Sequence, residues 1–217
     1  MSNFGSRHLR VVNPYKLAFR EAQSAVGGST VLKNAEDCDS VADAVADCVL
    51  VVGTTAVRDR KLDHAAKRLN AASAATIHSS LQQGRVALLF GSEKIGLTND
   101  DFSHCQWLMT ILTHSQNISM NLGQAVAVCL YELARDISPG LRNENRELPA
   151  TAQLEQISEG LLESLHISGY VKPGTDKMFE RKARQLILRM NLEAYDAKLF
   201  LGMVRQIVWK LRQSRRS

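Results

Sequence analysis

Short apolar runs alternate with longer stretches of helical spacing over the first two thirds of the chain. The runs expected to form strands are rich in Val, Leu and Ile and lie at residues 9–12, 48–53, 85–91 and 107–112, with a very short one at 31–32. Continuous apolar runs are typical of strands buried on both faces of a parallel sheet. The expected helices are residues 16–26, 40–47, 65–81 and 121–136. This alternation predicts an α/β fold, with a mostly parallel sheet and helices on both of its faces.

The pattern changes in the segment 137–151, which contains two prolines, a glycine and two asparagines and is typical of a linker. Beyond it, apolar residues recur only at helical spacing, in residues 153–165, 176–190 and 194–212. We therefore expect a sheet domain at residues 1–138, a linker at 139–151 and a small all-helical C-terminal domain at 152–217.

Positive charge is concentrated in the last third of the chain. Residues 151–217 carry 12 of the 27 Lys and Arg but only 7 of the 22 Asp and Glu, so the net charge of +5 lies entirely in this segment. A basic appendage beside a neutral domain suits a polyanionic partner such as RNA, although solvated helix faces are often basic as well. The candidate phosphate-binding residues are Arg181, Lys182, Arg184, Arg189, Lys198, Arg205, Lys210, Arg212, Arg215 and Arg216.

The composition argues against several other classes of protein. No apolar run of about 18 residues is present, so we expect no membrane-spanning helix, and the first residues lack the apolar core of a secretory signal. Cys38, Cys48, Cys105 and Cys129 have neither the CxxC spacing nor the Cys/His pairing of a zinc site. We expect reduced, mostly buried thiols in a cytoplasmic protein that binds no metal and no membrane.

The segment FGSEKIGLT, residues 90–98, directly follows one of the predicted buried strands. Ligands bind at the ends of strands in open parallel sheets, and a glycine there lets a ligand approach the backbone. Glu93 adds a carboxylate to this loop. Taken alone, the segment favours a tight turn that ends at a capping Thr98, with nothing bound.

Two further strands end in segments of similar character. Residues 117–125, NISMNLGQA, offer Ser119 as a helix cap and the side-chain amide of Asn121, which an ordinary helix start would also explain. Residues 51–58, VVGTTAVR, end a strand in small and hydroxyl side chains, and alone they would indicate a plain turn.

In their order and spacing, the three segments resemble the motifs of SPOUT methyltransferases of the TrmH and TrmJ type. FGSEKIGLTN and SMNLGQA are similar to the second and third motifs of that family, and the resemblance covers nearly the whole chain. The VVNP turn, VVGTTA and the basic helical tail resemble the TrmJ branch, whose members methylate the ribose of nucleotide 32 in tRNA anticodon loops. The resemblance implies a homodimeric enzyme that uses S-adenosylmethionine to methylate a ribose 2′-hydroxyl in tRNA. It also implies a trefoil knot at the C-terminal end of the sheet domain, an exception to the rule that chains avoid threading.

The resemblance further implies a cofactor site made largely of backbone groups from three loops. Matched position by position, its residues would be Thr54, Thr55, Ala56, Gly91, Ile111, Ile118, Ser119 and Met120. Glu93 and Asn121 would organise the loops at the edge of the site that faces a second subunit.

The match fails at the residue that the family uses for catalysis. The family's first motif, N-x-G-x-x-x-R, supplies an arginine that contacts RNA and activates the hydroxyl, and neither it nor the strand before it is found in this sequence. Val57 stands where TrmJ-type sequences usually have arginine, and Arg58 and Arg60 are candidate substitutes. The catalytic residue is therefore unassigned. Two interpretations stay open: a protein whose true start lies upstream, or a catalytically impaired SPOUT-fold RNA-binding protein.

Overall fold

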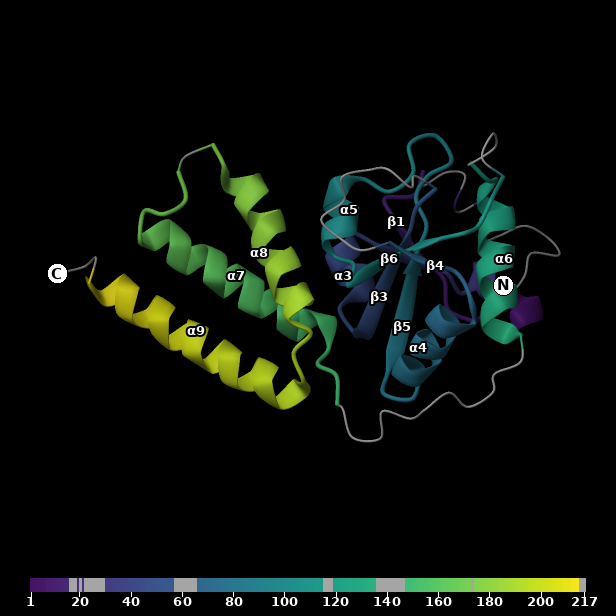
Figure 1. The fold of residues 1–217 in the computed structure, drawn as a ribbon. Helices are drawn as coiled ribbons and strands as arrows, with labels where there is room; N and C mark the ends of the chain where they lie inside the picture. The colour runs from purple at the N-terminus through teal and green to yellow at the C-terminus, as the bar shows by residue number, and fades with distance from the viewer. Residues whose placement is uncertain are drawn as a thin grey trace.

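The computed structural model describes residues 1–15, 19, 21, 30–56, 66–114, 119–135, 147–172 and 174–214. The elements of the sheet part, residues 1–135, are η1 (Ser2–Phe4), β1 (Arg10–Val12), α2 (Thr30–Lys33), β2 (Glu36–Cys38), α3 (Val41–Val45), β3 (Cys48–Thr54), β4 (Ala66–Arg68), α4 (Ala71–Leu81), β5 (Arg85–Leu89), α5 (Asn99–Ser103), β6 (Trp107–Thr110) and α6 (Leu122–Ala134). Those of the helical part, residues 147–214, are α7 (Thr151–Ile167), α8 (Asp176–Met190) and α9 (Ala194–Ser214). Figure 1 shows the two parts side by side, with α3 and α5 next to the helical part and α6 on the far side of the sheet.

Four strands form one parallel sheet in the order β4-β6-β3-β5, and β1 and β2 form a second, two-stranded parallel sheet. Strand β3 is central in the larger sheet, where Val52 is the partner of Trp107 on β6 and of Leu88 on β5. Because both pairings are parallel, the carboxyl ends of β3, β5 and β6 meet at one edge of the sheet.

Strand β3 is buried on both faces, as its continuous apolar run predicts. Val51 packs with residues of α3 and α5 on one face, whereas Leu50 and Val52 pack with Ile77 of α4 and Cys129 of α6 on the other. Val51 and Val52 are both fully inaccessible to solvent. The expectation of an α/β fold with helices on both faces of a parallel sheet is therefore confirmed.

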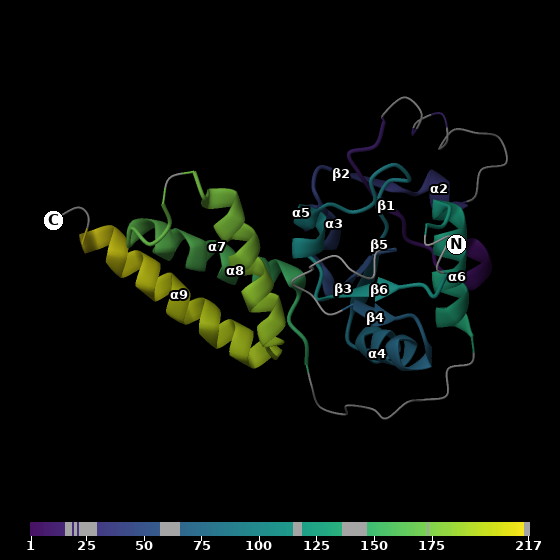
Figure 2. The same cartoon turned by 45° about the horizontal axis from the view of Figure 1, so that its top comes forward.

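The two-stranded sheet is tied to the larger one by a carboxylate. Asp47 accepts a hydrogen bond of 3.0 Å from Nη2 of Arg10 on β1 and one of 2.6 Å from Nη1 of Arg85 on β5. The hydrogen bond from Arg10 outweighs burial and holds the pKa of Asp47 well below its usual range. Figure 2 shows β1 and β2 beside α2, above the four-stranded sheet in this view.

Several short elements differ from the sequence prediction. Val31 and Leu32 lie in helix α2, so the strand expected there is wrong. Residues 66–68 form strand β4 instead of the first turn of a helix, and β2 and α5 were not predicted. Strands β2 (EDC) and β4 (AKR) are three residues long and polar, so no hydrophobic pattern marks them. Apart from residues 19 and 21, the helix expected at 16–26 lies outside the described residues.

In the helical part, α7 packs against both α8 and α9 around one apolar core. The core residues recur at helical spacing and are Leu154, Ile157, Ile187, Leu188, Ala197, Leu201, Val204 and Val208. Helices α7 and α9 run in the same direction, because Arg205 and Arg212 contact Gln156 and Glu163 in that order. They approach closely at Gly160, where an added Cβ would lie 2.6 Å from Cγ1 of Val204.

The start of α7 is anchored to the sheet part by two hydrogen bonds, of which the one from Thr151 is buried. Oγ1 of Thr151 donates a bond of 2.7 Å to the carbonyl of Cys48 on β3, and the backbone N–H of Ala152 donates one of 3.0 Å to the carbonyl of Ala46. Thr151 is 5% exposed. Such bonds would leave buried acceptors unpaired if they broke, so they fix the helical part on the sheet part.

Candidate functional site

The first loop of the site follows β3 and is bonded to both neighbouring strands. Oγ1 of Thr54 donates a hydrogen bond of 2.8 Å to the carbonyl of Leu89, the last residue of β5. The backbone N–H of Thr55 donates one of 3.0 Å to the carbonyl of Met109 on β6. Thr54 and Thr55 are half-buried and Ala56 is exposed. The carboxyl ends of β3, β5 and β6 are thus held together by residues that the sequence analysis expects at the cofactor.

The second loop, residues 91–98, folds back on itself after β5. The backbone N–H of Gly96 donates a 2.8 Å hydrogen bond to the carbonyl of Ser92, and Gly96 has a φ of 70°, which favours glycine. An added Cβ on Gly91 would lie 2.0 Å from the carbonyl carbon of Gly96. Leu97 is buried, and Thr98 caps helix α5. The two glycines therefore allow a tight loop whose far end is anchored in the core.

The third loop joins the second through a pair of polar side chains. Nδ2 of Asn121 donates a hydrogen bond of 3.1 Å to Oε1 of Glu93, while its Oδ1 accepts bonds from the backbone N–H groups of Gly123 and Gln124. Asn121, and not Ser119 as the sequence suggested, is therefore the cap of α6. The Leu122–Ala134 span of this helix agrees with the helix expected at 121–136. Directly before Asn121, Ser119 is exposed and Met120 is half-buried.

Most of the residues expected at the cofactor belong to these three strand ends, including Ile111, which follows β6 and is half-buried. Ile118 and the candidate arginines Arg58 and Arg60 lie outside the described residues.

The described loop residues suit an adenine nucleoside with a charged sulfonium. Thr55 and Ala56 have small side chains, and Ala56 is exposed, so a ligand can approach the backbone of the first loop. Ile111 and Met120 are apolar and half-buried and can cover the faces of a flat base. The carboxylate of Glu93 gives this edge of the site a negative charge.

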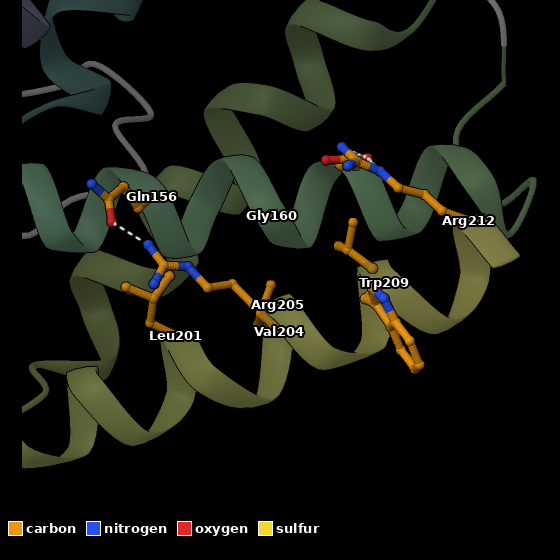
Figure 3. Close-up of a pocket in the computed structure, with 9 residues that line it drawn as sticks. Gln156, Gly160, Leu201, Val204, Arg205, Trp209 and Arg212 are labelled. Atoms are coloured by element: carbon orange, nitrogen blue, oxygen red, sulfur yellow. Dashed lines mark hydrogen bonds and ion pairs between the residues drawn. The ribbon is translucent and has the colours of Figure 1, made fainter.

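Most of the basic side chains proposed to meet RNA are exposed on α8 and α9, among them Lys182, Arg189, Lys198 and Lys210. Arg205 and Arg212 are exposed too, but each reaches back to α7, as Figure 3 shows. Nη2 of Arg205 donates to Oε1 of Gln156 at 3.1 Å, and Nε of Arg212 donates to Oε1 of Glu163 at 2.6 Å. These two arginines border a hollow of about 250 Å³ between α7 and α9. Arg215 and Arg216 lie outside the described residues.

Arg184 does not belong with the basic residues proposed to bind RNA. It is only 6% exposed, and its guanidinium is bonded to Glu155 and Glu180, so the prediction that it binds phosphate is wrong. A periodicity signal was available, because Arg184 is three and four residues from the buried Ile187 and Leu188 and so shares their helix face.

The electrostatics around Arg184 favour a fixed charge. Burial lowers the pKa of Arg184, but the hydrogen bonds and charges of Glu155 and Glu180 outweigh it and raise the pKa. The pKa of the nearby His104 is lowered, first by its burial and then by the positive charge of Arg184. His104 is therefore neutral at pH 7 and adds no second cation to the cluster.

The cysteines confirm the expectation of mostly buried thiols. Cys48, Cys105 and Cys129 are buried free cysteines, and Cys38 is half-buried. Burial raises the pKa of Cys48 to about 11 and that of Cys129 to about 12, so both thiols stay protonated at neutral pH. Among the described residues, no group of three or more His, Cys, Asp or Glu is placed to hold a metal ion. Nor does any helix in these ranges have the length and apolar character to span a membrane.

Comparison with known proteins gives consistent matches. Residues 1–131 match a family model described as the SpoU rRNA Methylase family. Curated proteins named tRNA (cytidine/uridine-2′-O-)-methyltransferase TrmJ are similar: that of Klebsiella pneumoniae is 30% identical and that of Cronobacter sakazakii 32% identical, each over 95% of this chain and 87% of the relative. The crystal structure of TrmJ from Z. mobilis is similar with a TM-score of 0.78 and 30% identity, over 95% of this chain and 89% of that one.

A parallel sheet with three such loops at its carboxyl edge, in a chain with these neighbours, defines a SPOUT-type methylase. The chain belongs to the SpoU rRNA methylase family, and its relatives are of the TrmJ type.

Proposed function

We propose that this protein transfers a methyl group from S-adenosylmethionine to a ribose 2′-hydroxyl of tRNA, at nucleotide 32 of the anticodon loop. The observation that carries the proposal is the joining of the three loops. Thr54 and Thr55 bond the first loop to the ends of β5 and β6, and Glu93 bonds the second loop to Asn121 of the third. The relatives that match 95% of this chain are named tRNA (cytidine/uridine-2′-O-)-methyltransferase, which supports 2′-O-methylation of tRNA.

The cofactor would be held by Thr54, Thr55 and Ala56, by Gly91, and by Ile111, Ile118, Ser119 and Met120. When bound, it supplies an electrophilic methyl group together with its own leaving group, so no metal is needed. The protein's contribution is to align the ribose oxygen with the methyl carbon and to accept the hydroxyl proton. Arg58 and Arg60, which follow the first loop, are our candidates to assist that hydroxyl.

The helical part would bind the tRNA backbone. Its exposed Lys and Arg side chains lie outside the apolar core and can meet phosphates without breaking the packing of α7, α8 and α9. A substrate held there would be fixed relative to the loops, because Thr151 and Ala152 anchor the helical part to β3 and α3.

A homodimer and a trefoil knot complete the proposed enzyme, which would act in the cytoplasm. The support for a second copy is the exposure of apolar residues on α6, where Val128 is 37% and Tyr131 54% exposed, although the helix follows an apolar periodicity. Leu112, next to Ile111 at the site, is 66% exposed. Apolar patches of this kind mark protein interfaces.

One observation favours a second candidate, a SPOUT-fold RNA-binding protein with impaired catalysis. None of the described loop residues, 54–56, 91–98, 111–114 and 119–121, is an arginine. Such a protein would bind cofactor and tRNA without transferring the methyl group.

Calorimetry with S-adenosylmethionine, followed by a methylation assay on an unmodified tRNA transcript, tests the proposal. We expect saturable binding of one cofactor per chain and incorporation of one methyl group per tRNA. Cofactor binding without methyl transfer would support the RNA-binding alternative. Absence of both binding and transfer would refute the assignment of the three loops.

A further inference from the structure

Arg184 is the one buried arginine among the described residues, and its guanidinium joins three helices. Nε donates to Oε2 of Glu155 on α7 at 2.8 Å, and Nη2 donates to Oε1 of Glu155 at 2.8 Å and to Oε1 of Glu180 on α8 at 3.0 Å. Nη1 donates to Oγ of Ser103 on α5 at 2.8 Å. All three guanidinium nitrogens therefore have acceptors.

The three partner residues divide unequally between the two parts of the molecule. Glu155 and Glu180 belong to the helical part and already neutralise the arginine, as a buried charge requires. Ser103, which is fully buried, belongs to the sheet part. The bond from Nη1 is thus not needed to balance the charge of Arg184, and it links the helical part to α5.

Helix α5 is in turn continuous with the second cofactor loop. It begins directly after Thr98, whose side chain accepts a hydrogen bond from the backbone N–H of Asp101, while the carboxylate of Asp101 accepts one of 2.7 Å from the backbone N–H of Thr98. Leu97 and Phe102, on either side of this cap, are buried in the same core cluster. Ser103 therefore lies on the same short helix as the cap that ends the loop containing Gly91 and Glu93.

We propose that Arg184 is a positioning residue for the cofactor loop 91–98: through Ser103 and α5 it couples the tRNA-binding helical part to the affinity for S-adenosylmethionine. The inference rests on the proposed function of both parts. It predicts that bound tRNA, by fixing α7 and α8, tightens the binding of the cofactor, and by thermodynamic reciprocity that the cofactor tightens the binding of tRNA.

The sharpest variant is Ser103→Ala, which removes the link while leaving Arg184 with Glu155 and Glu180. Its matched control is Ser158→Ala, because Ser158 is also buried but bonds within α7, to the carbonyl of Leu154. Arg184→Met removes the link from the other side, and Leu186→Met, at an exposed position outside the basic set, is the control on the same helix.

Cofactor and tRNA dissociation constants of the full chain, each measured with and without the other ligand, test the coupling. We expect Ser103→Ala to weaken cofactor binding roughly tenfold in the presence of tRNA and to abolish the mutual tightening. The double variant with Arg184→Met and Ser103→Ala should lose no more cofactor affinity than Ser103→Ala alone. Both control variants should bind cofactor and tRNA as the wild type does. If Ser103→Ala and Ser158→Ala lower the melting temperature alike and leave the coupling intact, Arg184 is merely structural and the proposal is wrong.

Hydrogen exchange separates this inference from the proposed function. If the wild-type chain binds no S-adenosylmethionine, the proposed function fails, yet faster amide exchange at residues 91–105 in Ser103→Ala than in Ser158→Ala would still establish Arg184 as the residue that positions the loop. Equal exchange rates in the two variants would refute that role.

Discussion

The sheet part and the helical part are built on opposite principles. In the sheet part the candidate site is made of backbone and small side chains at strand ends, so its properties depend on the path of the chain at Thr55 and Gly91. In the helical part the expected function belongs to long charged side chains outside a single apolar core. From this difference we expect that a single added Cβ in a loop abolishes cofactor binding by the sheet part. Binding of tRNA by the helical part should instead weaken gradually as charges are removed.

The largest effect is expected at Gly91. In Gly91→Ala the new Cβ would lie 2.0 Å from the carbonyl carbon of Gly96, so the loop 91–98 cannot close as it does here. We expect cofactor affinity, measured by calorimetry, to fall at least about 100-fold, since most loop contacts would be lost. The control Gly202→Ala places a Cβ in open space on α9 and should bind cofactor normally. Normal binding by Gly91→Ala would contradict the role of this loop.

Neutralising charge on the helical part should produce a smaller loss, confined to tRNA. Lys198 and Lys210 are exposed on α9, and changing both to Gln should weaken tRNA binding about five- to tenfold at low salt and reduce the salt dependence of the affinity. The matched control changes Arg7 and Lys33, exposed on the sheet part, to Gln. Filter binding at several salt concentrations compares the two double variants. An equal loss of tRNA affinity in both would contradict the assignment of tRNA binding to the helical part. Deleting residues 151–217 is a poorer test, because it also removes the bond from Thr151 to β3.

The junction between the parts is expected to contribute moderately to stability. Thr151→Val removes the buried hydrogen bond to the carbonyl of Cys48 and leaves that acceptor unpaired, which should lower the free energy of unfolding by about 1–2 kcal/mol. In the control Thr76→Val, on the exposed face of α4, we expect a change of less than about 0.5 kcal/mol. Chemical denaturation measures both, and equal values would show that the junction bond contributes nothing.

The smallest effect is a pH dependence at Asp47. Because the hydrogen bond from Arg10 lowers the folded-state pKa of Asp47 below its ordinary value of 3.8, this carboxylate stabilises the fold above that value. The contribution is lost as the pH falls through the lowered folded-state pKa. The difference in unfolding free energy between wild type and Asp47→Asn should be constant above about pH 5 and should shrink below about pH 4. A difference that grows on acidification would contradict the assignment.

Periodicity predicted the long elements of both parts and missed short ones, and it did not show which apolar helix faces are covered. The runs at 48–53 and 107–112 are strands because their apolar residues fill the cores on both faces of the sheet. The polar strands β2 and β4 owe their structure to backbone pairing with β1 and β6, which no side-chain pattern records. Helix α6 has the predicted length, yet of its apolar stripe only Cys129 is buried.

The candidate site was predictable in outline because its residues follow predicted strands. The bond between Glu93 and Asn121 joins residues 28 positions apart, and the sequence suggested only that both organise loops. The link from Arg184 to Ser103 spans 81 positions and joins the two parts, and in the sequence Arg184 is one of many basic residues. Contacts between parts depend on how they dock, which local patterns do not encode.

The central claim is that this chain places a tRNA ribose 2′-hydroxyl against S-adenosylmethionine. Its most direct test is transfer of labelled methyl groups to two tRNA transcripts that differ only at nucleotide 32, one with ribose and one with 2′-deoxyribose. The account predicts one methyl group per ribose-containing tRNA and none on the deoxy version. Equal labelling of both would contradict the proposed acceptor, and no labelling of either, with cofactor bound, would leave an RNA-binding protein in place of the enzyme.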